Sequence, residues 1–184
     1  MENKKLFILF FVFVVFVGIS LLVQSLLNDN NRNYTEQTFS SEDGVFFITV
    51  PRGWVQLFDY ELNDVAQIQA RNRRTNSFLV VITDSQEDFD DYNFERTIEI
   101  VKENLLAGWR NHTILSAIDT LIDEQPARQY EIEGSIDGTK AVMLATYIDG
   151  EKYFAQVLTW TIASRYKTSE KEFRAITNSV RGLN

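Results

Sequence analysis

The chain has 184 residues, of which 45% are hydrophobic and 13% aromatic, enough for one globular domain with an appended segment. Its 26 acidic and 18 basic residues give a net charge of −8, which disfavours a nucleic-acid-binding protein because that class normally has a basic excess. The chain has no cysteine, so disulfides, thiolate nucleophiles and thiolate metal sites are excluded.

The N-terminal residues 1–27 contain an uncharged apolar run over residues 6–27. As a helix this run would be roughly 33 Å long, enough to cross a hydrocarbon core of about 30 Å. We therefore expect residues 1–27 to form one transmembrane anchor. The alternative is a cleaved signal peptide, although its apolar region is usually shorter. Lys4 and Lys5 precede the run, so the positive-inside rule predicts a single-pass protein of the cell membrane with a cytoplasmic N-terminus.

Residues 28–37 are polar and are expected to form a linker, and residues 38–184 are expected to form a domain outside the cytoplasm. The pair Asp43-Gly44 predicts a hairpin, followed by a strand that ends at Pro51-Arg52-Gly53-Trp54. Trp54 is interpreted either as a packed corner of the core or as a platform that stacks on a ligand or partner.

Two strands are expected next, over residues 65–71 and 78–82, and the second is apolar throughout, as in the centre of a sheet. The turn between them carries Arg71, Arg73 and Arg74 on an otherwise acidic protein. This basic turn is a candidate contact for an acidic partner or for anionic headgroups, and the alternative is a solvated hairpin tip.

An acidic loop over residues 85–91 then precedes a predicted helix over residues 92–109, whose apolar stripe runs through Phe94, Ile98, Val101 and Leu105. The carboxylates of residues 84–91 are the best candidate for a calcium site, because hard cations prefer oxygen ligands from flexible loops. Their spacing does not match an EF-hand, and a solvated acidic loop is the alternative. The single histidine, His112, is expected in a solvated loop after the helix, and residues 114–122 are interpreted as a strand.

Residues 126–162 predict three antiparallel strands joined by tight turns at Asp137-Gly138 and Asp149-Gly150. These turns would place Ile136 opposite Thr139, Ile132 opposite Met143 and Tyr130 opposite Ala145 in the first hairpin. In the second hairpin they would place Ala145 opposite Phe154 and Ala141 opposite Leu158. One face would then collect apolar side chains only: Tyr130, Ile132, Ile136, Ala141, Met143, Ala145, Tyr147, Phe154, Leu158 and Trp160.

The other face of this meander is polar at one edge and apolar in the middle, so we expect another element of the chain to cover the apolar part. A last helix over residues 170–180 is expected to supply part of the cover. A capping box of Ser169 and Glu172 is predicted at its start and Gly182 after its end. We therefore predict an α+β fold, an α-β-α sandwich in which helices flank a central antiparallel sheet.

These features together resemble the PsbP-like family of exported bacterial proteins. The resemblance rests on the strand that ends in Pro51-Arg52-Gly53-Trp54, on the strand Tyr153-Phe154-Ala155-Gln156-Val157-Leu158, and on a last helix that reads Phe173-x-x-Ile176-x-x-Ser179-Val180-Arg181. It implies an antiparallel sheet between helices over residues 38–183, and a role in binding or assembly rather than catalysis. It carries over no functional residue, and relatives anchored by a lipidated cysteine differ from this chain, which has none.

The sequence contains no glycine-rich phosphate loop, no histidine pair and no nucleophile elbow, so we expect no cofactor, no metal and no catalytic site. The predicted function is a tethered, non-catalytic module that binds or helps assemble a neighbouring membrane or envelope protein. A small-ligand or lipid carrier is one alternative. The other is a hydrolase that uses two of Glu131, Glu133, Asp84 and Asp88, since Glu131 and Glu133 would be roughly 7 Å apart along one strand.

Overall fold

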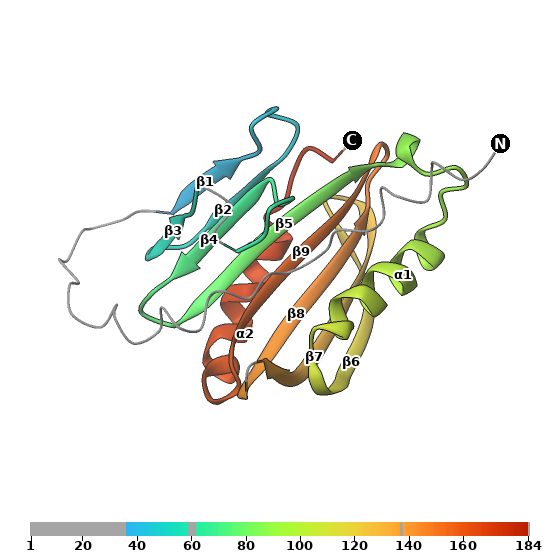
Figure 1. Cartoon of the computed structure of the whole chain (residues 1–184). Coiled ribbons are helices and arrows are strands. Elements are labelled where there is room, and N and C mark those ends of the chain that lie inside the picture. Colours follow the sequence, from blue (N-terminus) through green and yellow to red (C-terminus); the bar gives the residue numbers. More distant parts are fainter. Residues whose placement is uncertain (1–35, 59–61, 137, 184) are drawn as a thin grey trace.

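A seven-stranded antiparallel sheet forms the centre of the molecule (Figure 1), in a computed structural model that describes residues 36–58, 62–136 and 138–183. The strand order is β3-β4-β5-β9-β8-β7-β6. In chain order the sheet strands are β3 (Trp54–Gln56), β4 (Ile68–Asn72), β5 (Ser77–Ser85), β6 (Arg110–Ile122), β7 (Gln125–Ile136), β8 (Thr139–Asp149) and β9 (Tyr153–Ile162). A separate hairpin pairs β1 (Gln37–Ser40) with β2 (Phe47–Val50). The described residues also form the helices α1 (Phe94–Ala107) and α2 (Ala163–Asn178) and a short 3₁₀ helix, η3 (Gln86–Asp88), which give an α+β fold.

The β7–β8 hairpin has the predicted register: Ile136 pairs with Thr139 and Tyr130 with Ala145. The predicted register of the β8–β9 hairpin is wrong, because Ala145 pairs with Leu158 and not with Phe154. A two-residue Asp-Gly turn requires positive φ at both residues, and Gly150 does not adopt it. The chain instead connects the strands through residues 150–152, which shifts the pairing by four residues. Since side chains alternate with a period of two, an even shift leaves every residue on its predicted face.

The two faces of the sheet carry separate hydrophobic cores. Met143 and Ala145 point to the side that α1 covers, and Leu144 between them points to the side that α2 covers. All ten apolar residues assigned to one face from the sequence lie in the core beneath α1. Strands β8 and β9 are buried along almost their whole length, so helices on opposite faces are needed to keep water from both sides (Figure 1).

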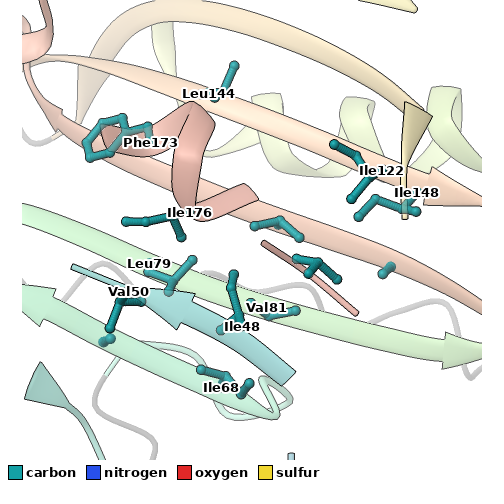
Figure 2. Packing of buried hydrophobic residues seen from close by; sticks show 14 of the residues in the cluster. Ile48, Val50, Ile68, Leu79, Val81, Ile122, Leu144, Ile148, Phe173 and Ile176 are labelled. Atoms are coloured by element: carbon teal, nitrogen blue, oxygen red, sulfur yellow. The ribbon is translucent and has the colours of Figure 1, made fainter. Parts of the chain in front are cut away.

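The core beneath α2 is completed by the β1–β2 hairpin. Figure 2 shows Phe173 and Ile176 of α2 in one cluster with Ile48 and Val50 of β2 and with side chains of the sheet. Ser179, at the end of α2, holds the hairpin in place, since its hydroxyl accepts from the Thr49 amide at 2.9 Å and lies 2.9 Å from the Thr49 carbonyl oxygen. The predicted alternation of β2 is confirmed, since Ile48 and Val50 are buried and Phe47 is exposed.

Several predicted boundaries are wrong at the ends of elements. Helix α2 begins at Ala163, directly after β9, so Ser169 is buried inside the helix and forms no capping box. The helix ends at Asn178, and Gly182, at φ +90°, lies in the tail that follows. His112 belongs to β6 and not to a loop, because that strand begins at Arg110.

The predicted transmembrane anchor of residues 1–27 and most of the linker lie outside the described residues. Within residues 36–58, 62–136 and 138–183, no helix is both long and apolar enough to cross a membrane.

Candidate interaction surfaces

Trp54 is packed in the core and presents no surface for a partner. Its side chain is only 1% exposed and meets Phe173 edge-on, with 6.4 Å between ring centroids. The indole Nε1 donates to Glu172 Oε1 at 2.7 Å, so its polar group is satisfied by α2. The Pro-Arg-Gly-Trp corner therefore joins the edge of the sheet to α2.

The predicted basic turn lies between β4 and β5. Arg73 and Arg74 are exposed and Arg71 is half-buried. Asn72 shapes the turn, because its buried side-chain oxygen accepts from the backbone amide of Arg74 at 3.1 Å. The start of α2 adds a further charge that the sequence did not reveal: Arg165 Nη1 donates to the carbonyl oxygen of Arg74 at 2.9 Å.

We call Arg73, Arg74 and Arg165 the basic corner. All three residues are exposed at one end of the sheet, and a hydrogen bond fixes α2 against the turn. The rest of the molecule is acidic, since the chain has a net charge of −8. Exposed arginines on an acidic domain attract anionic groups, and arginine can bind carboxylates or phosphates through two parallel hydrogen bonds.

The four carboxylates proposed for a hydrolase do not all meet at one place. Glu131 forms an ion pair with Arg174 of α2, whose guanidinium also donates to Gln129 Oε1 at 3.0 Å and Glu170 Oε1 at 3.0 Å. Glu131 lies on the face of the sheet that α2 covers, and Asp84, by the alternation of β5, lies on the other face. Glu131 is therefore a structural anion that fixes α2.

The acidic segment of residues 84–91 forms the end of β5 and η3, and not a loop that surrounds an ion. Burial raises the pKa of Asp84, and the nearby charge of Asp88 raises it further. Among the described residues no group of acidic or histidine side chains could hold a metal ion. Asp149, across the sheet end, accepts from Tyr92 Oη at 2.6 Å and from Gln86 Nε2 at 3.1 Å, which secures the segment before α1.

The exposed apolar side chains of the edge strand β6 are a surface feature that the sequence analysis did not predict. Nearly all of its 13 residues are at least partly exposed, and four large apolar side chains reach solvent: Ile114, Leu115, Ile118 and Leu121. In the sequence these side chains belong to an apolar segment, residues 114–122, in which apolar and polar residues do not alternate clearly. It could not be interpreted because only the strand order shows that β6 has one neighbour, β7.

His112 lies on β6 beside the end of α1. Its Nδ1 is 3.2 Å from the carbonyl oxygen of Trp109, and its ring is exposed. No described carboxylate or hydroxyl is hydrogen-bonded to it, so the residues around it form no nucleophile-and-base arrangement.

No family model matches the sequence, and no curated protein matches it. Solved structures do match the fold. Cyanobacterial PsbP (CyanoP) from Synechocystis sp. PCC 6803 is similar over 85% of this chain and 98% of its own, with a TM-score of 0.60 and 16% identity.

Two further structures share the fold. LpqN, which is involved in cell envelope biogenesis of Mycobacterium tuberculosis, matches 82% of this chain and 98% of its own, with a TM-score of 0.59 and 12% identity. The Ran-binding protein Mog1p of Saccharomyces cerevisiae matches 82% of this chain and 96% of its own, with a TM-score of 0.56 and 10% identity. The resemblance seen in the sequence is therefore confirmed at the level of the fold, and the domain has the fold of the PsbP-like proteins.

Proposed function

We propose that the chain is a membrane-tethered, non-catalytic module whose domain outside the cytoplasm binds a neighbouring membrane or envelope protein. Residues 1–27 would provide the anchor, and residues 28–37 would let the domain reach partners close to the bilayer. The proposal fits the roles of two proteins with the same fold, one of which binds Ran while the other is involved in cell envelope biogenesis.

The basic corner is the observation that carries this proposal. Three exposed arginines lie at one end of the sheet of an acidic domain, where Arg165 of α2 is hydrogen-bonded to the backbone of the turn that carries Arg73 and Arg74. Such a cluster favours a partner with an acidic surface. Electrostatic attraction of this kind accelerates association and selects the orientation of the partner, more than it adds affinity.

The test is recovery of the partner from cross-linked membranes that contain the full chain with a C-terminal affinity tag. We expect one defined protein to be enriched with the unmodified chain and lost with the double variant Arg73→Glu, Arg74→Glu. Arg96→Glu is the matched control, because Arg96 is an exposed arginine on α1, outside the basic corner. Recovery that is unchanged by the double variant, or equally reduced by the control, would remove the basic corner as the contact.

A further inference from the structure

A row of buried polar side chains crosses one end of the sheet, on the face that α2 covers. Asn72 of β4 pairs with Ser77 of β5, and Ser77 pairs in turn with Thr161 of β9. The alternation of these strands places all three side chains on the α2 side, and each residue is at most 1% exposed. Polar groups that are buried so completely normally have a hydrogen-bond partner.

Two members of this row lack a partner. Thr161 Oγ1 donates to a backbone carbonyl oxygen of the turn between β4 and β5 at 2.9 Å. Ser77 Oγ and Asn72 Nδ2, however, are buried without a partner within the described part of the chain, and so is Thr75 Oγ1 of the same turn. The Asn72 amide cannot be turned round, because its Oδ1 already accepts from two backbone amides of the turn, at 3.1 and 3.4 Å. The unpartnered atom of Asn72 is therefore a donor.

The start of α2 adds positive charge to the same end of the sheet. The helix begins two residues after Thr161; among the described residues no side chain caps it, and its first turn contains no acidic residue. The backbone amides of such a helix start lack partners in the helix and carry a partial positive charge. Arg165 lies in this first turn and donates to the carbonyl oxygen of Arg74, so the helix start is held against the turn between β4 and β5.

The described carboxylates on this side are either distant or already paired. The acid in the same row is Glu133 of β7, which is separated from Thr161 by strand β8. Glu172 of α2 accepts from the indole of Trp54. This end of the sheet therefore offers hydrogen-bond donors and positive charge to an anion.

We propose that this end of the sheet binds a phosphate group. Asn72 Nδ2 and the hydroxyls of Ser77 and Thr75 would donate to its oxygens. Arg165 and the first amides of α2 would balance its charge, as helix N-termini commonly do for phosphates. A phosphate group suits donors from several elements, because its oxygens surround a tetrahedral centre, whereas the two oxygens of a carboxylate lie in one plane. Free phosphate and the headgroup of a membrane lipid present this same chemistry.

The test is isothermal titration of the full chain in detergent with inorganic phosphate at constant ionic strength. Heats of binding are measured because phosphate also stabilises folded proteins without occupying a site. We expect saturable binding that Ser77→Ala weakens by about tenfold, since that variant removes one donor. Asn72→Asp should weaken the binding further, because it keeps the acceptor that shapes the turn but places a negative charge where the donor was.

Thr146→Val is the matched control. Thr146 Oγ1 is also buried without a described partner on the α2 side, but it lies within β8 and away from this end of the sheet. In phosphate-free buffer Ser77→Ala and Thr146→Val should both keep or raise the Tm, because each removes a buried hydroxyl that has no partner. Only Ser77→Ala should lose affinity for phosphate.

Four results would overturn the proposal. The chain could bind no phosphate, it could bind acetate as tightly as phosphate, or Thr146→Val could lose as much affinity as Ser77→Ala. A lower Tm of Ser77→Ala in phosphate-free buffer would also overturn it, since the Ser77 hydroxyl would then have a partner within the fold.

A second arm of the experiment distinguishes the two sources of the phosphate group. The full chain is placed in nanodiscs of phosphatidylcholine, with or without phosphatidic acid, and is titrated again with inorganic phosphate. If phosphatidic acid abolishes the heat of binding, the site takes a lipid headgroup. If the heat is the same in both discs, the site takes soluble phosphate. Either result supports the phosphate site and assigns its source.

This inference uses the basic corner but does not depend on a protein partner. Ser77→Ala keeps Arg73, Arg74 and Arg165, so it should lose affinity for phosphate while recovery of a partner from cross-linked membranes persists. Phosphate binding without a recovered partner would support the phosphate site and refute the partner contact. Recovery of a partner through Arg73 and Arg74, without any phosphate binding, would do the opposite.

Discussion

Replacing Trp54 separates a structural role of this residue from a role in binding. Trp54→Phe keeps most of the apolar contact with Phe173 but removes the donor to Glu172. A hydrogen bond to a charged acceptor contributes about 1.5–3 kcal/mol, and Glu172 is half-buried and can regain water, so we expect a loss of about 1–2 kcal/mol. Trp54→Ala also leaves a cavity in the core beneath α2, for a loss of about 3–5 kcal/mol.

The assay is thermal unfolding of the full chain in detergent, followed by circular dichroism at 222 nm and by tryptophan fluorescence. A loss of 3–5 kcal/mol corresponds to a fall in Tm of roughly 6–20 °C for a domain of this size. Glu172→Gln is the control for the hydrogen bond, since it keeps an acceptor but removes its charge. The Tm of this variant should lie between that of the unmodified chain and that of Trp54→Phe. Partner recovery should be unaffected by Trp54→Phe below its Tm. A Trp54→Ala variant within 0.5 kcal/mol of the unmodified chain would refute the core assignment.

Three further substitutions test the face of the sheet that α1 covers. Trp160→Ala should cost about 3–5 kcal/mol in denaturant unfolding, because Trp160 is 6% exposed and stacks on Phe78 at 5.3 Å; an unchanged midpoint would contradict the core beneath α1. Gly134→Ala should cost about 1–3 kcal/mol in the same measurement, since an added Cβ would lie 2.6 Å from the buried Trp109 ring. Asp84→Asn should raise the Tm at pH 7 and lose that gain at pH 3. The raised pKa of Asp84 means that the folded state binds the proton more readily than the unfolded state, so ionisation of Asp84 lowers the stability of the fold as the pH rises. An equal gain in Tm at pH 7 and pH 3 would rule out this cause.

The parts of the fold that the sequence predicted correctly depend on local alternation. Met143, Leu144 and Ala145 were assigned to the correct faces even though the pairing of β8 with β9 was wrong by four residues. The assignment of faces needs only the parity of each position. The register, in contrast, depends on the backbone of one turn, and Asp149-Gly150 resembles a two-residue turn in sequence without adopting its φ angles.

The candidate sites were predicted less well, because each combines residues that are distant in the chain. Arg73 and Arg74 were visible as a basic turn, but Arg165 joins them only because α2 begins directly after β9 and runs back past that turn. Glu131 had the spacing of a catalytic carboxylate, and only its ion pair with Arg174, 43 positions along the chain, shows that it binds α2 to the sheet.

The sequence by itself determined the alternating strands, the amphipathic α1, the two apolar faces and the resemblance to the PsbP-like proteins. These properties depend on side chains that are a few residues apart. The period at which apolar residues recur indicates whether a segment is a strand or a helix and which of its sides is buried. Only the tertiary structure decided that β5 pairs with β9, that β6 is left at the edge and that three arginines share a corner. The order of the strands depends on which long-range pairings together bury the most apolar surface, and a local sequence pattern does not predict those pairings.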